Sequence, residues 1–126
     1  MNRHARWAVF WAYAAALFLA THWPRLVVDS PVRGTDKVIH AAVFCIWTLL
    51  LGRATEAGSR GWRLITLAVV ACVYAAIDEG LQAIPALGRT CSAADLGANL
   101  AGVALAIVAV GVLSRRASSA TGALSP

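Results

Sequence analysis

Four long apolar stretches, separated by short charged segments, set the strongest limit on how this chain of 126 residues can fold. They are Trp7 to His22, Val38 to Leu51, Leu64 to Ile77 and Leu96 to Leu113. A helix needs roughly 20 apolar residues to cross the hydrocarbon core of a bilayer. The first and fourth stretches approach this length, and polar residues at the outer ends of the second and third can extend them. Each stretch is therefore predicted to be a spanning helix.

The overall composition excludes an ordinary soluble domain. Hydrophobic residues make up 60% of the chain and charged residues 13%, and the mean hydropathy is +0.69. Soluble domains are closer to half apolar and about a quarter charged. A water-soluble helical bundle of this length could not bury so much apolar surface around one core. The sequence predicts an all-α protein, a four-helix transmembrane bundle.

The positive charge of the chain is distributed as membrane topology requires. The formal net charge is +5, but the basic residues lie in short loops and tails between apolar stretches, so no nucleic-acid partner is predicted. On one side of the membrane lie Arg3, Arg6, Arg53, Arg60, Arg63, Arg115 and Arg116. On the other lie Arg25, Arg33, Lys37 and Arg89. Because loops rich in Lys and Arg stay in the cytoplasm, both termini are predicted to be cytoplasmic. The first stretch is interpreted as a retained span, because no convincing signal-peptide cleavage site precedes Trp23.

The chain is predicted to form one membrane domain over residues 1–116, followed by a disordered tail over 117–126. Small residues recur every four positions in three of the stretches, which lets helix backbones approach closely in lipid. These stripes are Ala8, Ala12, Ala16 and Ala20, then Ala68, Cys72, Ala76 and Gly80, then Ala94, Ala98, Gly102 and Ala106. The spacing does not decide whether they pack within one chain or between chains, so a helix-mediated homo-oligomer stays open.

The polar residues that a membrane protein should avoid fall into three clusters, each with helical spacing. They are Asp36 and Lys37 with His40, Asp78 and Glu79 with Gln82, and Arg89 with Asp95 and Asn99. With the termini inside and a rise of about 1.5 Å per residue, all three clusters reach the outer boundary of the bilayer. His22, at the end of the first stretch, is placed to join them.

Ionisable groups at the edge of the hydrocarbon cost several kcal/mol unless they are paired or hydrated. One explanation is a salt-bridge network that locks the bundle; the other, which the set as a whole favours, is a functional site. Asp95 is open between a helix cap and a ligand contact, because Ser92 and Asp95 match a helix capping box. Cys45, Cys72 and Cys91 do not have the spacing of metal ligands.

The three clusters together resemble a known family. Asp36-Lys37-x-x-His40, Asp78-Glu79-x-x-Gln82, and Arg89 followed by Ser92, Asp95, Asn99 and Gly102 resemble the VanZ-like family, whose pattern is D-K-x-x-H, D-E-x-x-Q and R-x-x-S-x-x-D-x-x-x-N-x-x-G. The resemblance covers about Asp36 to Gly102. It departs at Ala106, where members often have another glycine, and in a slightly longer loop from Pro85 to Arg89. It implies a multi-pass protein of the bacterial cytoplasmic (inner) membrane. The founding member is linked to resistance to teicoplanin, a glycopeptide that acts on cell-wall precursors outside the membrane.

The leading hypothesis is a site in the outer leaflet for an anionic lipid headgroup or a lipid-linked cell-wall precursor, with membrane lipids as the partners. Arg89 and Lys37 would contact phosphate or carboxylate. The orienting carboxylates would be Asp36, Asp78, Glu79 and Asp95. Hydrogen bonds would come from His40, Gln82 and Asn99.

Two alternatives stay open. The same site could belong to a membrane enzyme, with Glu79, Asp78 and His40 as acid–base groups, although no nucleophile motif is present. No cofactor is expected, and the nearby Lys37 and Arg89 argue against a divalent metal. The chain could instead be a structural or accessory protein whose polar network only stabilises the bundle. A proton-coupled transporter ranks lower, because a proton relay should place polar groups through the midplane.

Overall fold

The structure, a computed structural model, describes residues 1–23, 34–55, 60–87 and 91–122. Within these ranges the chain is all-helical, which confirms the predicted class. The elements are α1 (Arg3–His22), α2 (Thr35–Ala54), α3 (Arg60–Leu81), the 3-10 turn η1 (Pro85–Leu87) and α4 (Ala93–Gly122). Each predicted apolar stretch forms the middle or the end of one helix, and polar residues extend it. Helices are expected here because in lipid the backbone polar groups must pair within their own segment.

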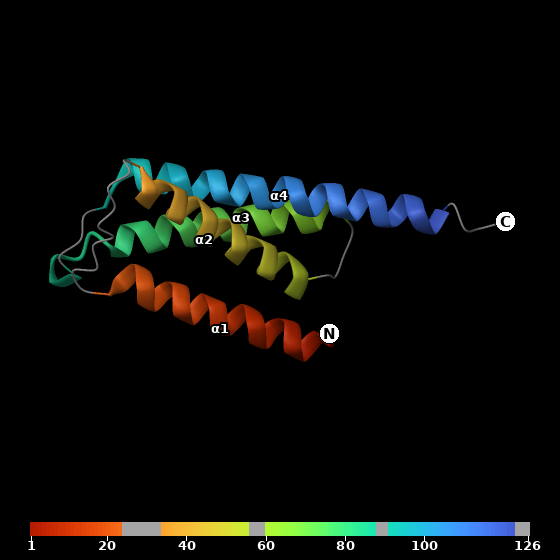
Figure 1. The fold of residues 1–126 in the computed structure, drawn as a ribbon, viewed down its shortest axis with the longest axis horizontal. Helices are drawn as coiled ribbons and strands as arrows, with labels where there is room; N and C mark the ends of the chain where they lie inside the picture. The colour runs from red at the N-terminus through yellow and green to blue at the C-terminus, as the bar shows by residue number, and fades with distance from the viewer. Residues whose placement is uncertain (24–33, 56–59, 88–90, 123–126) are drawn as a thin grey trace.

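The helices lie side by side along one direction and alternate in sense, as Figure 1 shows. The N- and C-termini therefore lie at the same end of the bundle, together with the end of α2 and the start of α3. The opposite end gathers the last turns of α1 and α3 and the first turns of α2 and α4. This second end is where the sequence predicts the polar clusters.

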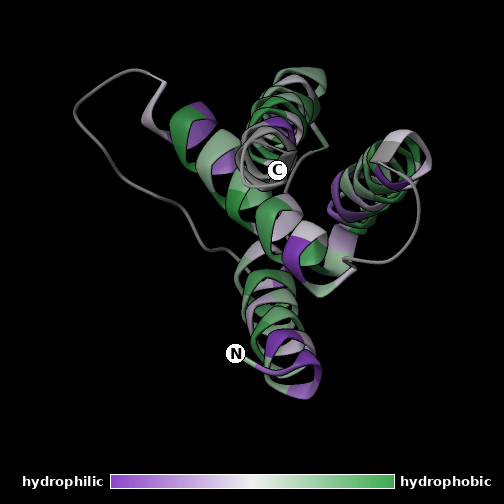
Figure 2. Cartoon of the chain, turned by 90° about the vertical axis from the view of Figure 1, so that its right-hand side faces the viewer, coloured by the Kyte–Doolittle hydropathy of each residue, from purple (hydrophilic) through white to green (hydrophobic). Residues whose placement is uncertain are grey.

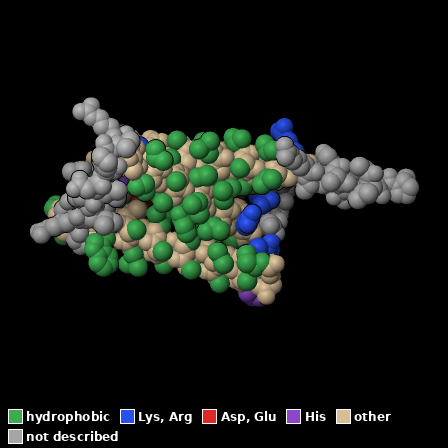
Figure 3. All heavy atoms as spheres, viewed as in Figure 1, with side chains coloured by type: hydrophobic (Ala, Val, Ile, Leu, Met, Phe, Trp, Pro, Cys, Tyr) green, Lys and Arg blue, Asp and Glu red, His purple; other side chains and the backbone are tan. Residues whose placement is uncertain are grey.

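Three of the helices are long and apolar enough to cross a membrane: Thr35–Ala54, Gly61–Leu81 and Ala93–Arg115. The helix α1 is not among them, because its first turn holds Arg3, His4 and Arg6 and its middle is mostly alanine and aromatic residues. Apolar side chains cover the middle of the face drawn in Figure 3, and most of the Lys and Arg side chains visible there gather at the end with the termini.

The helix α2 lies at the centre of the bundle: it contacts each of the other three helices, and α4 most extensively. Figure 2 views the bundle from the end with the termini. It shows α1, marked N, and α4, marked C, on opposite sides of the bundle. The middle of the core is aromatic. Trp47 stacks on Tyr74 of α3 with ring centroids 4.5 Å apart, and Phe10 of α1 meets Trp47 edge to face at 5.3 Å. These three rings join α1, α2 and α3.

The contact between α2 and α4 brings two backbones together. A Cβ atom at Gly102 would lie only 2.1 Å from the carbonyl oxygen of Ala41 and 3.0 Å from the backbone nitrogen of Cys45. Only glycine fits at this position. Ala106, one turn further along α4, is completely buried and continues the seam. The small-residue stripe predicted for the fourth apolar stretch is therefore used inside the chain over Gly102 and Ala106, whereas Ala94 is exposed.

The other two predicted stripes do not pack inside the chain. On α1 all four alanines of the stripe are exposed, and on α3 so are Cys72, Ala76 and Gly80. The inward faces instead carry larger or differently phased residues, among them Phe10, Leu17, Leu67, Ala71 and Ala75. α3 packs mainly against α4, and the small Ala71 and Ala75 of its inward face are completely buried. The exposed stripes are left at the surface of the single chain.

The last helix is longer than the sequence predicts. α4 continues to Gly122, six residues past the predicted end of the membrane domain at Arg116 and into the segment for which disorder is predicted. The residues after Arg116 are Ala, Ser, Ser and Ala, and no proline lies between Arg116 and Pro126, so no strong stop signal interrupts the helix. Residues 123–126 are not among those described.

The α2–α4 contact gives a direct test of the bundle. Gly102→Ala places a methyl group against the Ala41 carbonyl, which forces the helices apart, and we expect a loss of stability of about 1–3 kcal/mol. Thermal unfolding of the purified protein in detergent, followed by circular dichroism, measures it. Gly80→Ala is the matched control, because nothing lies within 4 Å of a Cβ there; we expect it to be neutral or slightly stabilising. Equal stability of the two variants would contradict the close approach.

Candidate functional site

The end of the bundle remote from the termini carries the predicted site. Asp36, Lys37 and His40 lie in the first two turns of α2, and Asp95 and Asn99 lie in the first two turns of α4. Asp78 and Glu79 are in the last turn of α3, and Gln82 follows it. These eight residues meet at one end, as the sequence predicts. The ninth, Arg89, lies outside the described residues, as do Arg25 and Arg33.

An exposed ion-pair network forms the rim of the site. The Lys37 Nζ lies 2.6 Å from Oδ2 of Asp36 and also pairs closely with Oδ1 of Asp95 on α4. The side chain of Lys37 is 38% exposed, that of Asp36 51% and that of Asp95 18%. Lys37 thus bridges α2 and α4, and two carboxylates already balance its charge. It is less available as the anion contact that the sequence suggests.

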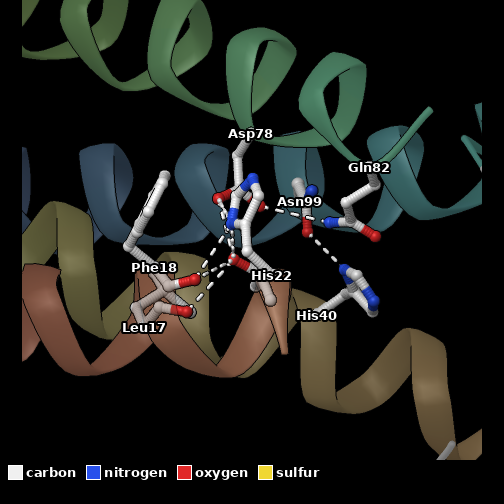
Figure 4. A network of polar contacts seen from close by, with 8 residues as sticks. Leu17, Phe18, His22, His40, Asp78, Gln82 and Asn99 are labelled. Atoms are coloured by element: carbon white, nitrogen blue, oxygen red, sulfur yellow. Dashed lines mark hydrogen bonds and ion pairs between the residues drawn. The ribbon is translucent and has the colours of Figure 1, made fainter. Parts of the chain in front are cut away.

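Below the rim, Asp78 connects α3 to α1. Its side chain is buried, and its Oδ1 accepts a hydrogen bond from Oγ1 of Thr21 at 2.9 Å. Its Oδ2 accepts from Nε2 of Gln82 at 3.3 Å, and Nδ1 of His22 lies 3.8 Å from Oδ1 (Figure 4). His22 therefore joins the polar end, stacked on Phe18 with ring centroids 4.1 Å apart. Both oxygens of this buried carboxylate are occupied.

A second link between α2 and α4 lies about one turn deeper than Lys37 and Asp95. Nδ1 of His40 is 2.9 Å from Oδ1 of Asn99, as Figure 4 shows. A carbonyl oxygen only accepts, so Nδ1 of His40 carries the hydrogen. Asn99 is completely buried, and its Nδ2 has no hydrogen-bond partner among the described residues. The pair fixes the ring of His40 and leaves one amide donor free.

Glu79 connects α3 to the start of α4. Its Oε1 accepts a hydrogen bond from the backbone N–H of Ser92 at 2.6 Å. Ser92 Oγ in turn accepts from the backbone N–H of Asp95 at 3.3 Å. Half of the predicted capping box is present, but Glu79 takes the reciprocal place that Asp95 would fill. The Asp95 carboxylate is instead paired with Lys37 of α2, in an ion pair between the two helices.

Three polar atoms at this end of the bundle are buried without a hydrogen-bond partner in the described part of the chain: Glu79 Oε2, Asn99 Nδ2 and His22 Nε2. Buried polar atoms are normally paired, so such atoms mark places where water or a ligand is accommodated. Together they offer a carboxylate acceptor, an amide donor and an imidazole nitrogen. Of the predicted acid–base groups, only Glu79 has a carboxylate oxygen that is buried and without a partner. No group of three His, Cys, Asp or Glu residues suited to a metal ion occurs among the described residues.

Thr21 is the member of the site that sequence reasoning missed. Its hydroxyl contacts Asp78 from another helix and also lies 3.1 Å from the carbonyl oxygen of Leu17. A threonine in an apolar helix commonly bonds to its own backbone in this way, which makes it unremarkable in sequence. The available signal was its position beside His22 at the end of the first stretch.

Comparison of the chain with protein-family models, with curated proteins and with solved structures finds no match.

The Thr21 contact yields a prediction about stability. Thr21→Val keeps the shape of the side chain but removes the donor to a buried carboxylate, so we expect a loss of about 1–3 kcal/mol in the free energy of unfolding. Thr66→Val is the control, because Thr66 is exposed on α3 at the other end of the bundle. Thermal unfolding in detergent compares the two, and an unchanged Thr21→Val protein would mean that the Asp78 contact contributes nothing.

Proposed function

We propose that the chain is a VanZ-like protein of the bacterial cytoplasmic membrane that binds, at its outer face, the headgroup of an anionic lipid or of a lipid-linked cell-envelope precursor. The observation that supports this best is a buried polar site in which some hydrogen-bonding atoms have no partner among the described residues. Glu79 Oε2 and Asn99 Nδ2 are buried and unpaired among the described residues, beneath the exposed rim of Asp36, Lys37 and Asp95. A network built only to hold helices together gains nothing from leaving such atoms unpaired.

The charges of the site favour a ligand with mixed chemistry over a bare phosphate. In the described part of the site, four carboxylates face one lysine, and that lysine is already paired. The phosphate contact therefore falls to Arg89, whose guanidinium can bind two oxygens at once. The carboxylate of Glu79 would accept a hydroxyl or amide hydrogen, and Asn99 would donate to a carbonyl or hydroxyl oxygen. A precursor headgroup that combines phosphate with sugar hydroxyls and amides offers all of these groups.

We place α1 in the membrane as a fourth span, with both termini in the cytoplasm. It has 20 residues, as α2 does, and its exposed face carries Trp11, Phe18 and Leu19. Its last turn joins the polar site through Thr21, so it reaches the same level as the ends of α3. The excess of arginines at the end with the termini supports this orientation.

The orientation can be tested with the cysteines that the chain already has. Cys91, two residues before α4, and Cys72, in the middle of α3, are both free and exposed in the single chain. A membrane-impermeant maleimide should label Cys91 in right-side-out spheroplasts and leave Cys72 unlabelled, since lipid would surround it. Cys91→Ser should abolish the labelling. Labelling of Cys91 only in inverted vesicles would place the polar end in the cytoplasm.

Ligand binding can be separated from stability with two variants. Glu79→Gln keeps an acceptor for the Ser92 N–H but converts the unpaired oxygen into a donor, so we expect the co-purified lipid to be lost and the fold to be retained. Thr21→Val should weaken the fold and retain the lipid in the protein that remains. Mass spectrometry of lipids from gently purified protein is the readout, with Arg89→Ala as a second binding variant. Teicoplanin susceptibility of a host that carries each variant at equal abundance reports on the cell envelope.

The second candidate is a structural or accessory protein. It is favoured by the fact that the described polar pairs also tie helices together: Lys37 with Asp95, His40 with Asn99, and Asp78 with Thr21. Under this reading, lipid content and teicoplanin susceptibility would follow the abundance of folded protein in every variant. Glu79→Gln protein with normal stability and normal lipid would then favour the structural role.

A further inference from the structure

At the opposite end of the bundle, near the termini, the end of α2 and the start of α3 enclose a groove of about 190 Å³. Its lining residues are Leu51, Thr55, Trp62, Arg63, Thr66, Leu67 and Val70. The walls are mostly apolar, and Trp62, at the first turn of α3, is 73% exposed. Exposed indoles next to an apolar helix are typical of the membrane–water boundary. The groove therefore spans the depth at which lipid headgroups meet acyl chains.

Arg63 lines this groove, and part of its guanidinium group has no hydrogen-bond partner among the described residues. Its Nη2 donates to the carbonyl oxygen of Gly52 at 2.6 Å, and its Nε is buried without a hydrogen-bond partner in the described part of the chain. No carboxylate among the described residues pairs with it. A half-buried guanidinium that no described carboxylate neutralises is costly in free energy in an apolar wall, and it suits a bound anion.

Among the described residues, the charge around the groove is all positive. The described carboxylates, Asp36, Asp78, Glu79 and Asp95, all lie at the other end of the bundle. The groove end carries Arg3, Arg53 and Arg63, and Figure 3 shows basic side chains gathered there. Basic pockets between membrane helices bind anionic lipid headgroups.

We infer that this groove binds one anionic phospholipid from the leaflet at the terminal end of the bundle. The phosphate would lie on Arg63, and an acyl chain would lie along Leu67 and Val70. This site is separate from the polar site at the other end. It requires only that the bundle lies in a membrane.

The test uses the purified full chain in detergent, with phosphatidylglycerol or phosphatidylcholine added at equal concentration and the bound lipid counted by native mass spectrometry. The wild-type protein should retain more phosphatidylglycerol than phosphatidylcholine. Arg63→Gln, which removes the positive charge and keeps an amide donor, should reduce this preference about tenfold, the scale of one charge-assisted contact. Arg3→Gln is the control, because Arg3 is exposed at the same end but does not line the groove.

A second variant blocks the groove and leaves Arg63 in place. Thr66 is exposed at the groove, so Thr66→Phe should fill it without disturbing the core and should lower the retention of both lipids. If Arg63→Gln fails to fold, this variant decides the matter alone. The inference is overturned if the wild-type protein shows no preference for phosphatidylglycerol. It is also overturned if Arg3→Gln loses as much of this preference as Arg63→Gln does, or if Thr66→Phe retains as much lipid as the wild type.

Discussion

The contact of α2 with α4 at Gly102 determines how the polar end is built. Because a side chain at Gly102 would collide with the Ala41 carbonyl, the two backbones can meet only where this glycine lies. His40 precedes Ala41, and Asn99 lies one turn before Gly102, so the same approach brings these two side chains within hydrogen-bond distance. One turn further out it brings Lys37 to Asp95. In lipid, where apolar surfaces gain little from meeting each other, such close backbone packing is what holds a helix pair together.

The other two helices join this pair in different ways. α1 packs mainly on α2 and α3 mainly on α4, and the rings of Phe10, Trp47 and Tyr74 meet in the middle of the bundle. At the polar end α1 and α3 rely on the buried Asp78, which reaches from α3 to Thr21 of α1. Most of the side-chain ion pairs and hydrogen bonds between described helices lie at this end, although Tyr13 also donates to the Val43 carbonyl and Arg63 to the Gly52 carbonyl. That concentration ties all four helices together at this end, while three of its buried polar atoms stay unpaired in the described chain.

The sequence predicts the helices and the polar end well because both depend on rare residues. Charged side chains are costly in an apolar span, so Asp78, Glu79 and Asn99 stand out without a structure. The inward faces of α1 and α3 are harder to predict, since in lipid both the packed face and the outer face of a helix are apolar. The sequence pattern gives no reason to place Phe10 inside the bundle and Ala8 outside it, yet only Phe10 is buried. Partner choice is also beyond the sequence, because Asp95 can serve as a cap or as the partner of Lys37, and only the distance between α2 and α4 selects the second.

The bond from Glu79 to the backbone of Ser92 has a consequence for the connection between α3 and α4. It fixes the first residue before α4 directly to the last turn of α3, so the relative height of the two helices does not depend on the segment that joins them. A change in the length of that connection would then leave the register of α3 and α4 in place, because the Glu79–Ser92 bond does not pass through it. The connection between α3 and α4 and the packing of the bundle are therefore two separate parts of the design, and the first can change without the second.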